Sequence, residues 1–245
     1  MLPSISCLFL IFFWIENSHE SCQFLEQIRD VEVRGSIDGL GQHRQWEIRS
    51  KVASLNRFTE CRLGYELEVP KGAFLDLDTI NSSLPRHFLF SNHRFNVEAP
   101  AERSRAHKIY LVGKKIFRKT FILEETLSFP LHFRYQAANK DGKSATVSFP
   151  PPKLLIDCPE DYRVWKLETC VGQLRALRGV GVATDAPTWL SLVTTNGWRS
   201  PIKIMILTGN TTFIPLVIMA TIFVVFISLI LLFTGSNENS HKKDE

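Results

Sequence analysis

The sequence predicts a mainly β protein, in which an antiparallel β-sandwich-like domain is followed by a single transmembrane helix. Two observations support the sheet: alternating apolar and polar residues recur at spacings of about ten residues, and helical periodicity is scarce there. A third observation supports the helix. Residues 213–233 form a 21-residue run that contains no charged side chain.

The expected strands are short and are separated by turn signals. An Asn139-Lys140-Asp141-Gly142 cluster offers a hairpin turn, and Pro150-Pro151-Pro152 requires extended backbone outside a ladder. Alternation and β-branched or aromatic content predict strands over residues 63–69, 108–112, 116–123, 127–135, 145–149, 162–167 and 189–194.

The apolar run at 213–233 matches the bilayer in length. At a rise of about 1.5 Å per residue, a helix of this size covers roughly 30 Å, the thickness of the hydrocarbon core. Pro215 falls in the first turn, where its missing N–H loses no partner. We therefore expect a membrane span here, with a buried helix of a soluble core as the alternative.

The N-terminal end predicts the orientation of this span. Residues 1–21 hold an apolar core of signal-peptide length, although no clean cleavage site follows it. An uncleaved signal anchor is the alternative. A signal peptide places residues 22–196 in the lumen as one domain, with 197–212 as a membrane-proximal linker that is either interfacial or a last strand. The product is a single-pass type I protein.

The C-terminal tail carries a candidate address. In residues 234–245, Lys242 and Lys243 occupy the third and fourth places from the carboxyl end and form a KKxx signal. Coat proteins read such a tail and return its carrier to the endoplasmic reticulum membrane, which is the location we predict. A solvated tail that follows the positive-inside bias is the alternative.

Cysteine usage and one sequon suit an oxidising compartment. Besides Cys7 in the signal segment, four cysteines remain, and they allow three disulfide pairings between which the sequence does not choose. These candidates are Cys22, Cys61, Cys158 and Cys170. Asn81 begins an Asn-Ser-Ser acceptor in a polar stretch and is expected to carry a glycan, whereas the Asn210 acceptor beside the membrane is expected to stay bare.

Charge and motifs point away from several function classes. The net charge of +4 is spread along the chain and no RNA-binding signature occurs, so we expect no nucleic-acid partner. Asp76-Leu77-Asp78 is a D-x-D pair of the kind that glycosyltransferases use to hold a metal, but it reads equally as an exposed turn. No other catalytic, metal or cofactor motif is found, so we predict no enzyme activity and no cofactor.

Three short elements occur in a characteristic order. They are Glu98-Ala99-Pro100, the run from His132 to Tyr135, and a proline-rich strand end that leads from Pro150 to Cys158. Upstream, residues 69–76 hold a proline-glycine turn, an apolar residue and an Asp. Across roughly residues 60 to 160 the chain resembles the PIG-X family. Gln136 departs from that pattern, in which a second His is expected.

The resemblance implies a non-catalytic role. PIG-X members stabilise PIG-M, the multi-spanning catalytic subunit of the mannosyltransferase that adds the first mannose to the GPI-anchor precursor. On this reading the D-x-D pair is incidental. Partner contact is assigned to five residues of the shared elements, namely Glu98, Pro100, His132, Arg134 and Tyr135.

Three other functions are compatible with parts of the sequence. A cargo receptor of the early secretory pathway, like the p24 family, shares the one-span layout, but no heptad run precedes residue 213. A glycosyltransferase would act through Asp76 and Asp78. A cell-surface adhesion protein conflicts with the dilysine tail.

Overall fold

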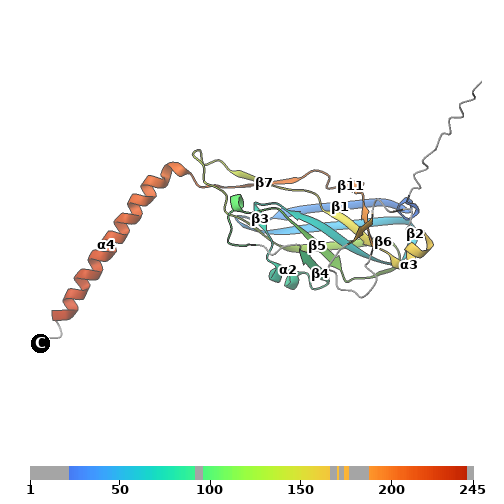
Figure 1. Ribbon diagram of the computed structural model, residues 1–245, viewed down its shortest axis with the longest axis horizontal. Coiled ribbons are helices and arrows are strands. Elements are labelled where there is room, and N and C mark those ends of the chain that lie inside the picture. Colours follow the sequence, from blue (N-terminus) through green and yellow to red (C-terminus); the bar gives the residue numbers. More distant parts are fainter. Residues whose placement is uncertain (1–21, 92–95, 166–169, 171–173, 177–187, 242–245) are drawn as a thin grey trace, which may run out of the picture.

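A computed structural model describes residues 22–91, 96–165, 170, 174–176 and 188–241. The mainly β prediction is confirmed, with one long apolar helix at the C-terminal end (Figure 1). The strands are β1 Ile28–Asp38, β2 His43–Val69, β3 Ala73–Phe74, β4 His87–Ser91, β5 His107–Gly113, β6 Phe117–Phe133, β7 Ala145–Phe149, β8 Lys153–Asp157, β9 Leu174–Ala176, β10 Thr188–Leu192, β11 Asn196–Gly197 and β12 Ile202–Ile206. The helices are α1 Gln23–Glu26, α2 Leu77–Ser83, α3 Pro159–Val164 and α4 Ile214–His241, with 3-10 turns η1 Ala101–Arg103 and η3 Thr211–Phe213.

Strand β2 belongs to both layers of the sandwich. Its first part pairs with β1 and β6, and its last part pairs with β5 and β8. The change follows a register irregularity between Ala53 and Phe58, where residues 54–57 have no partner on β6. One 27-residue strand therefore links the β11-β1-β2-β6-β3 layer to the β4-β5-β2-β8-β10-β9 layer.

The core fills the space between these layers. Trp46 from the first part of β2 and Tyr65 from its last part are both fully buried, and Phe129 of β6 packs against Trp46 with ring centroids 5.5 Å apart. Phe149 of β7 also contacts the Trp46 ring, at 5.3 Å. Burial alternates along β6 from Leu123 to Phe133, as expected for a strand with one face on a core.

Most predicted strands are present, with two differences. The expected strands 116–123 and 127–135 are a single strand, β6, which ends at Phe133. The expected strand 162–167 is wrong as far as the structure describes it, because Tyr162 lies in α3. Pro159 at the first position of that helix, followed by Glu160 and Asp161, is a typical helix start.

The turn at Lys140 and Asp141 forms, but it does not join two paired strands. Strand β7 pairs with β12 instead of β6, with Ile202 opposite Phe149. The segment that had two interpretations, interfacial or strand, thus contains a strand that runs from Ile202 to Ile206.

Helix α4 extends away from the sheets (Figure 1). Among the described residues it is the one helix long and apolar enough to cross a membrane, over Thr211–Phe233 with a mean hydropathy of 3.1. Thr221 and Ser228 each donate to the carbonyl four residues earlier, at 2.8 Å, so neither hydroxyl needs a partner outside the helix.

The two ends of the β domain differ. The end next to α4 holds β3 and η1, and we call it the helix end; the opposite end holds α1 and α3, and we call it the disulfide end (Figure 1). At the disulfide end Cys22 pairs with Cys170, and Cys61 pairs with Cys158. The structure therefore selects one of the three possible pairings.

Candidate partner-contact site

The proline-glycine turn, the Glu-Ala-Pro element and the run from His132 to Tyr135 meet at the helix end, around the side chain of Arg134. The fourth shared element, from Pro150 to Cys158, leads away from it to the disulfide end. The guanidinium donates to the carbonyl oxygens of Asn96 at 2.5 Å and Ala99 at 2.7 Å through Nη1, and to that of Ala73 at 3.3 Å through Nε. It also lies over the Phe74 ring, 5.0 Å from the centroid. We call Arg134, these three carbonyls and Phe74 the Arg134 clamp.

The clamp joins three segments that are far apart in the sequence. The backbone of Arg134 donates to the carbonyl of Gly72 at 2.9 Å, and the carbonyl of Tyr135 accepts from Ala101 at 3.0 Å. Pro100 is the N-cap residue of η1, and the Ala99 carbonyl before it accepts from Arg134. The proline-glycine turn, the Glu-Ala-Pro element and the end of β6 are thus held together by one cation.

Gly72 has to be small because of this packing. A Cβ built there would lie 2.6 Å from Cγ2 of Val147 and 3.2 Å from Nε2 of Gln136. Gln136, at the position of an expected His, donates to the carbonyls of Gly72 at 3.3 Å and Arg134 at 2.9 Å. Its amide therefore supports the same turn.

The side chains around residue 134 do not continue the alternation of β6. Alternation along the expected strand 127–135 would put His132 and Arg134 on one wet face, with Gln136 following, but alternation holds only within a strand and β6 ends at Phe133. Arg134 consequently turns inward and is 3% exposed, whereas Tyr135 turns outward and is 75% exposed. Burial lowers the pKa of the Arg134 guanidinium.

The other predicted contact residues lie around the clamp. Glu98 is exposed, Pro100 is half-buried, and His132 is half-buried between two rings. The His132 ring stacks on Phe74 with centroids 5.1 Å apart and meets His43 edge-on at 4.7 Å. At this surface the side chains of Glu98, Pro100, His132 and Tyr135 are at least partly accessible, and Arg134 holds the backbone beneath them.

The electrostatics favour a neutral imidazole at this surface. Burial lowers the pKa of His132, the nearby His43 lowers it further, and the Asp76 carboxylate opposes both effects. His132 pairs in register with His43 of β2 and with Phe74 of β3.

Asp76 has a structural task. It is the N-cap of α2, accepts from the backbone N–H of Asp78 at 3.3 Å and also accepts from the Thr79 hydroxyl. The bond from Thr79 is the main reason that the pKa of Asp76 is lowered. Asp78 is exposed in the first turn, where a carboxylate favours the helix dipole. Helix capping thus accounts for the D-x-D pattern.

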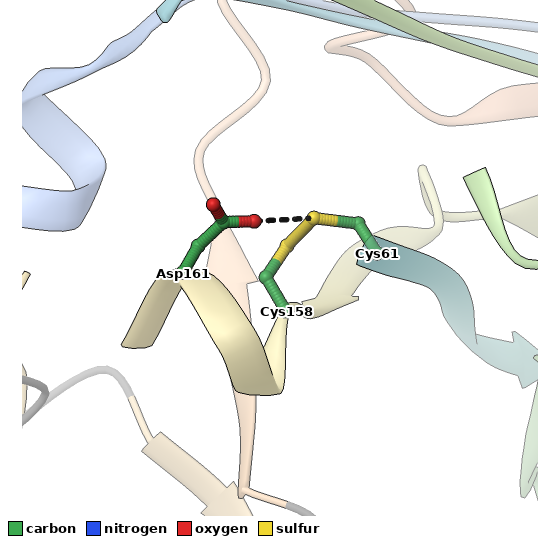
Figure 2. A group of neighbouring side chains, drawn as sticks. All are labelled: Cys61, Cys158 and Asp161. Carbon is green, nitrogen blue, oxygen red and sulfur yellow. Dashed lines mark hydrogen bonds between the residues drawn. A yellow bond between two sulfur atoms is a disulfide. The ribbon is translucent and has the colours of Figure 1, made fainter. Parts of the chain in front are cut away.

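At the disulfide end, a carboxylate lies beside one disulfide. Figure 2 shows Asp161 pointing at Cys61, with Oδ2 3.4 Å from Sγ. Cys61, Cys158 and Asp161 are close enough to suggest a metal site, but both sulfurs are bonded to each other and supply no thiolate ligand. Asp161 instead accepts from the Thr59 backbone at 3.0 Å and from its hydroxyl at 2.7 Å, which joins α3 to β2.

A buried carboxylate was missed by the sequence reasoning. Glu125 occupies a core-facing position of β6, accepts from the Tyr65 hydroxyl at 3.2 Å and lies 3.2 Å from Nε2 of His87. The pKa of Tyr65 is raised well above its usual value by burial and by the charge of Glu125. A hollow of about 440 Å³ lies alongside, between β6 and the 83–87 segment. The sequence does carry a signal for this residue: Glu125 lies two positions from both Leu123 and Leu127, so alternation puts its side chain on their core-facing side of the strand.

The remaining predicted sites are the two glycosylation acceptors and the dilysine tail. Asn81 lies on the exposed side of α2, and Lys242 and Lys243 fall outside the described residues. The Asn210 side chain caps η3 by accepting from the Thr212 backbone at 2.9 Å and from its hydroxyl at 2.7 Å.

A comparison with protein-family models places the chain. The model described as PIG-X / PBN1 matches residues 39–235, which include the Arg134 clamp and the apolar part of α4. The chain belongs to the PIG-X / PBN1 family. Membership implies the role of an accessory subunit of GPI mannosyltransferase I, in agreement with the resemblance seen in the sequence. A search of curated proteins found no match.

Proposed function

We propose that this PIG-X / PBN1 member is a non-catalytic subunit that stabilises the catalytic subunit PIG-M in the endoplasmic reticulum membrane. The observation that carries the proposal is the family match, which begins at residue 39, directly after β1, and extends into α4. It therefore includes the β domain from the β1–β2 turn onward and the apolar part of the helix. A subunit that binds only the folded form of its partner raises the stability of that form by mass action.

The surface around the Arg134 clamp is the proposed contact with PIG-M. Tyr135 presents an exposed aromatic ring, and aromatic side chains dominate the binding energy of many interfaces. Glu98 adds an exposed carboxylate on the turn that Arg134 holds. Because the turn is pre-organised by hydrogen bonds, little ordering entropy is lost on binding.

The proposed topology is single-pass type I. Residues 1–21 act as a signal peptide, the β domain lies in the lumen, and Lys242 and Lys243 recruit coat proteins on the cytosolic side. The two disulfides support an oxidising compartment for the β domain. Two experiments test this topology. Endoglycosidase H should shift the wild-type protein on a gel but should not shift Asn81→Gln. Surface biotinylation should label Lys242→Ser/Lys243→Ser but not the wild type.

Deletion of the gene, followed by rescue, tests the function. Deletion should lower both PIG-M abundance and surface GPI-anchored proteins, and Asp76→Asn/Asp78→Asn should restore both. Normal PIG-M abundance after deletion would contradict the stabilising role. Failure of the double Asp variant, despite normal expression, would favour a catalytic D-x-D pair.

Two surface variants locate the contact. Tyr135→Ala should reduce co-purification of PIG-M, whereas Leu55→Ala, an exposed apolar residue (59%) of the irregular 54–57 segment, should not. Both variants should express at the wild-type level, because neither side chain is in the core. Equal co-purification of the two variants would move the contact away from the Arg134 clamp.

A further inference from the structure

The segment that enters α4 is bonded to a loop far away in the sequence. The Asn139 backbone donates to the Gly209 carbonyl at 2.9 Å and accepts from Thr211 at 3.0 Å. Its side-chain Nδ2 donates to the Thr208 hydroxyl at 2.9 Å, and that hydroxyl donates to the Lys143 carbonyl at 2.5 Å. We call the contact between residues 139–143 and 208–211 the junction.

The junction leaves no free linker before the helix. η3 begins at Thr211, capped by Asn210, and α4 follows at Ile214. Since a 3-10 helix rises about 2 Å per residue, η3 adds only about 6 Å between Thr211 and Ile214. The loop at Asn139, which is hydrogen-bonded to Thr211, therefore lies within roughly 10 Å of the start of α4. If α4 crosses a bilayer, residues 139–143 are therefore held at its surface.

The side chains presented there suit that position. The side chain of Lys143 is 79% exposed, and Lys140 is also exposed. Met205 and Leu207, which precede the junction, are 74% and 86% exposed. Asp141 is the acidic residue of the loop and lies 2.9 Å from the Lys143 ammonium, so with Lys203 of β12 the local charge remains positive.

We propose that Lys140, Lys143, Met205 and Leu207 form a surface that rests on the lipid bilayer. The two ammonium groups contact headgroup phosphates, and the two apolar side chains enter the boundary between headgroups and acyl chains. The β domain then stands at a fixed height on the membrane instead of moving on a tether. This surface is separate from the proposed contact with PIG-M and rests on α4 spanning the membrane.

Spin-label accessibility on the purified full-length protein in nanodiscs tests the proposal. Ser144→Cys carries the label in the loop, 69 positions before Phe213 in the chain, and Leu55→Cys carries it on the 54–57 segment as the matched control. One label per chain confirms that the native disulfides are intact. Ala138→Cys, also exposed, replaces Ser144→Cys if that variant fails to fold.

The label at 144 is expected to lose accessibility to a water-soluble nickel complex on transfer from detergent to nanodiscs, whereas the label at 55 keeps it. Adding phosphatidylserine to phosphatidylcholine should deepen the loss at 144, and Lys140→Gln/Lys143→Gln should remove the effect of phosphatidylserine. Equal accessibility at 144 and 55 would overturn the proposal. A loss at 144 that ignores lipid charge would overturn the role given to the lysines.

Discussion

The two ends of the β domain are closed by different chemistry. At the disulfide end, Cys22–Cys170 and Cys61–Cys158 join segments 148 and 97 residues apart. At the helix end no disulfide is present among the described residues, and Arg134 joins its segments through three carbonyl oxygens. One end is secured by covalent bonds, and the other depends on hydrogen-bond geometry.

The difference has a physical meaning. A disulfide stabilises mainly by restricting the unfolded chain, so it does not fix the conformation of the exposed residues near it. A buried guanidinium acts in the native state, because each carbonyl must lie at bonding distance from it. At the helix end, the hydrogen bonds of Arg134 thus fix the backbone conformation of an exposed turn. A fixed conformation suits a surface that binds a partner.

The largest effect should come from the disulfide end. The Cys61→Ala/Cys158→Ala variant should lose about 4 kcal/mol of unfolding free energy, in line with a closed loop of about 100 residues. Denaturant unfolding of the full chain in detergent measures it, and wild type in reducing agent serves as a second route. An unfolding midpoint equal to that of the wild type would show that the Cys61–Cys158 disulfide does not stabilise its end of the domain.

Among single substitutions at the helix end, Arg134→Ala should cause the largest loss of stability. It removes the donor that the carbonyls of Ala73, Asn96 and Ala99 share and leaves a void where the buried side chain lay, and we expect a loss of about 3 kcal/mol of unfolding free energy. Arg134→Lys should recover only part of this, since one ammonium does not reproduce the guanidinium fork. Arg49→Ala, whose side chain is 68% exposed, is the matched control and should fall within about 0.5 kcal/mol of wild type.

Limited proteolysis separates the two ends directly. Arg134→Ala should open cleavage near residues 96–101, and reduction should open cleavage near α3. If Arg134→Ala and the reduced wild type are cleaved at the same positions, the domain unfolds as a unit and its two ends are not stabilised independently.

Removing the cap of α2 should have a smaller effect. Asp76→Ala should cost about 1 kcal/mol, while Asp76→Asn should cost less because an amide oxygen still accepts the cap bond. The pKa of Asp76 is lowered in the folded protein, so its contribution is present at neutral pH and is lost as the pH falls through that lowered pKa. Asp78→Ala is the control, and an equal loss would argue against capping.

The smallest expected effect is the pH response of His132. Because its pKa is lowered on folding, the unfolded chain binds the proton more tightly. Stability should therefore fall as the pH decreases below about 6.5, the usual histidine value. Unfolding curves measured between pH 7 and 5 should show a smaller loss of unfolding free energy for His132→Gln than for the wild type. An equal loss in both proteins would mean that His132 does not cause the pH dependence.

Sequence reasoning succeeded where a pattern is local. The apolar run before Phe233 defines the helix by composition alone, and alternation located β5, β7 and β10. The order of the Glu-Ala-Pro element and the run from His132 to Tyr135 was enough for the family, since order along the chain does not depend on contacts.

Tertiary structure decided what depends on partners distant in the chain. Disulfide pairing, the passage of β2 between layers and the pairing of β7 with β12 all follow from which segments meet, and local composition does not encode this. Arg134 is the clearest case. Past the last ladder residue, Phe133, the direction of a side chain is no longer set by the strand's period of two but by the carbonyls that it can reach.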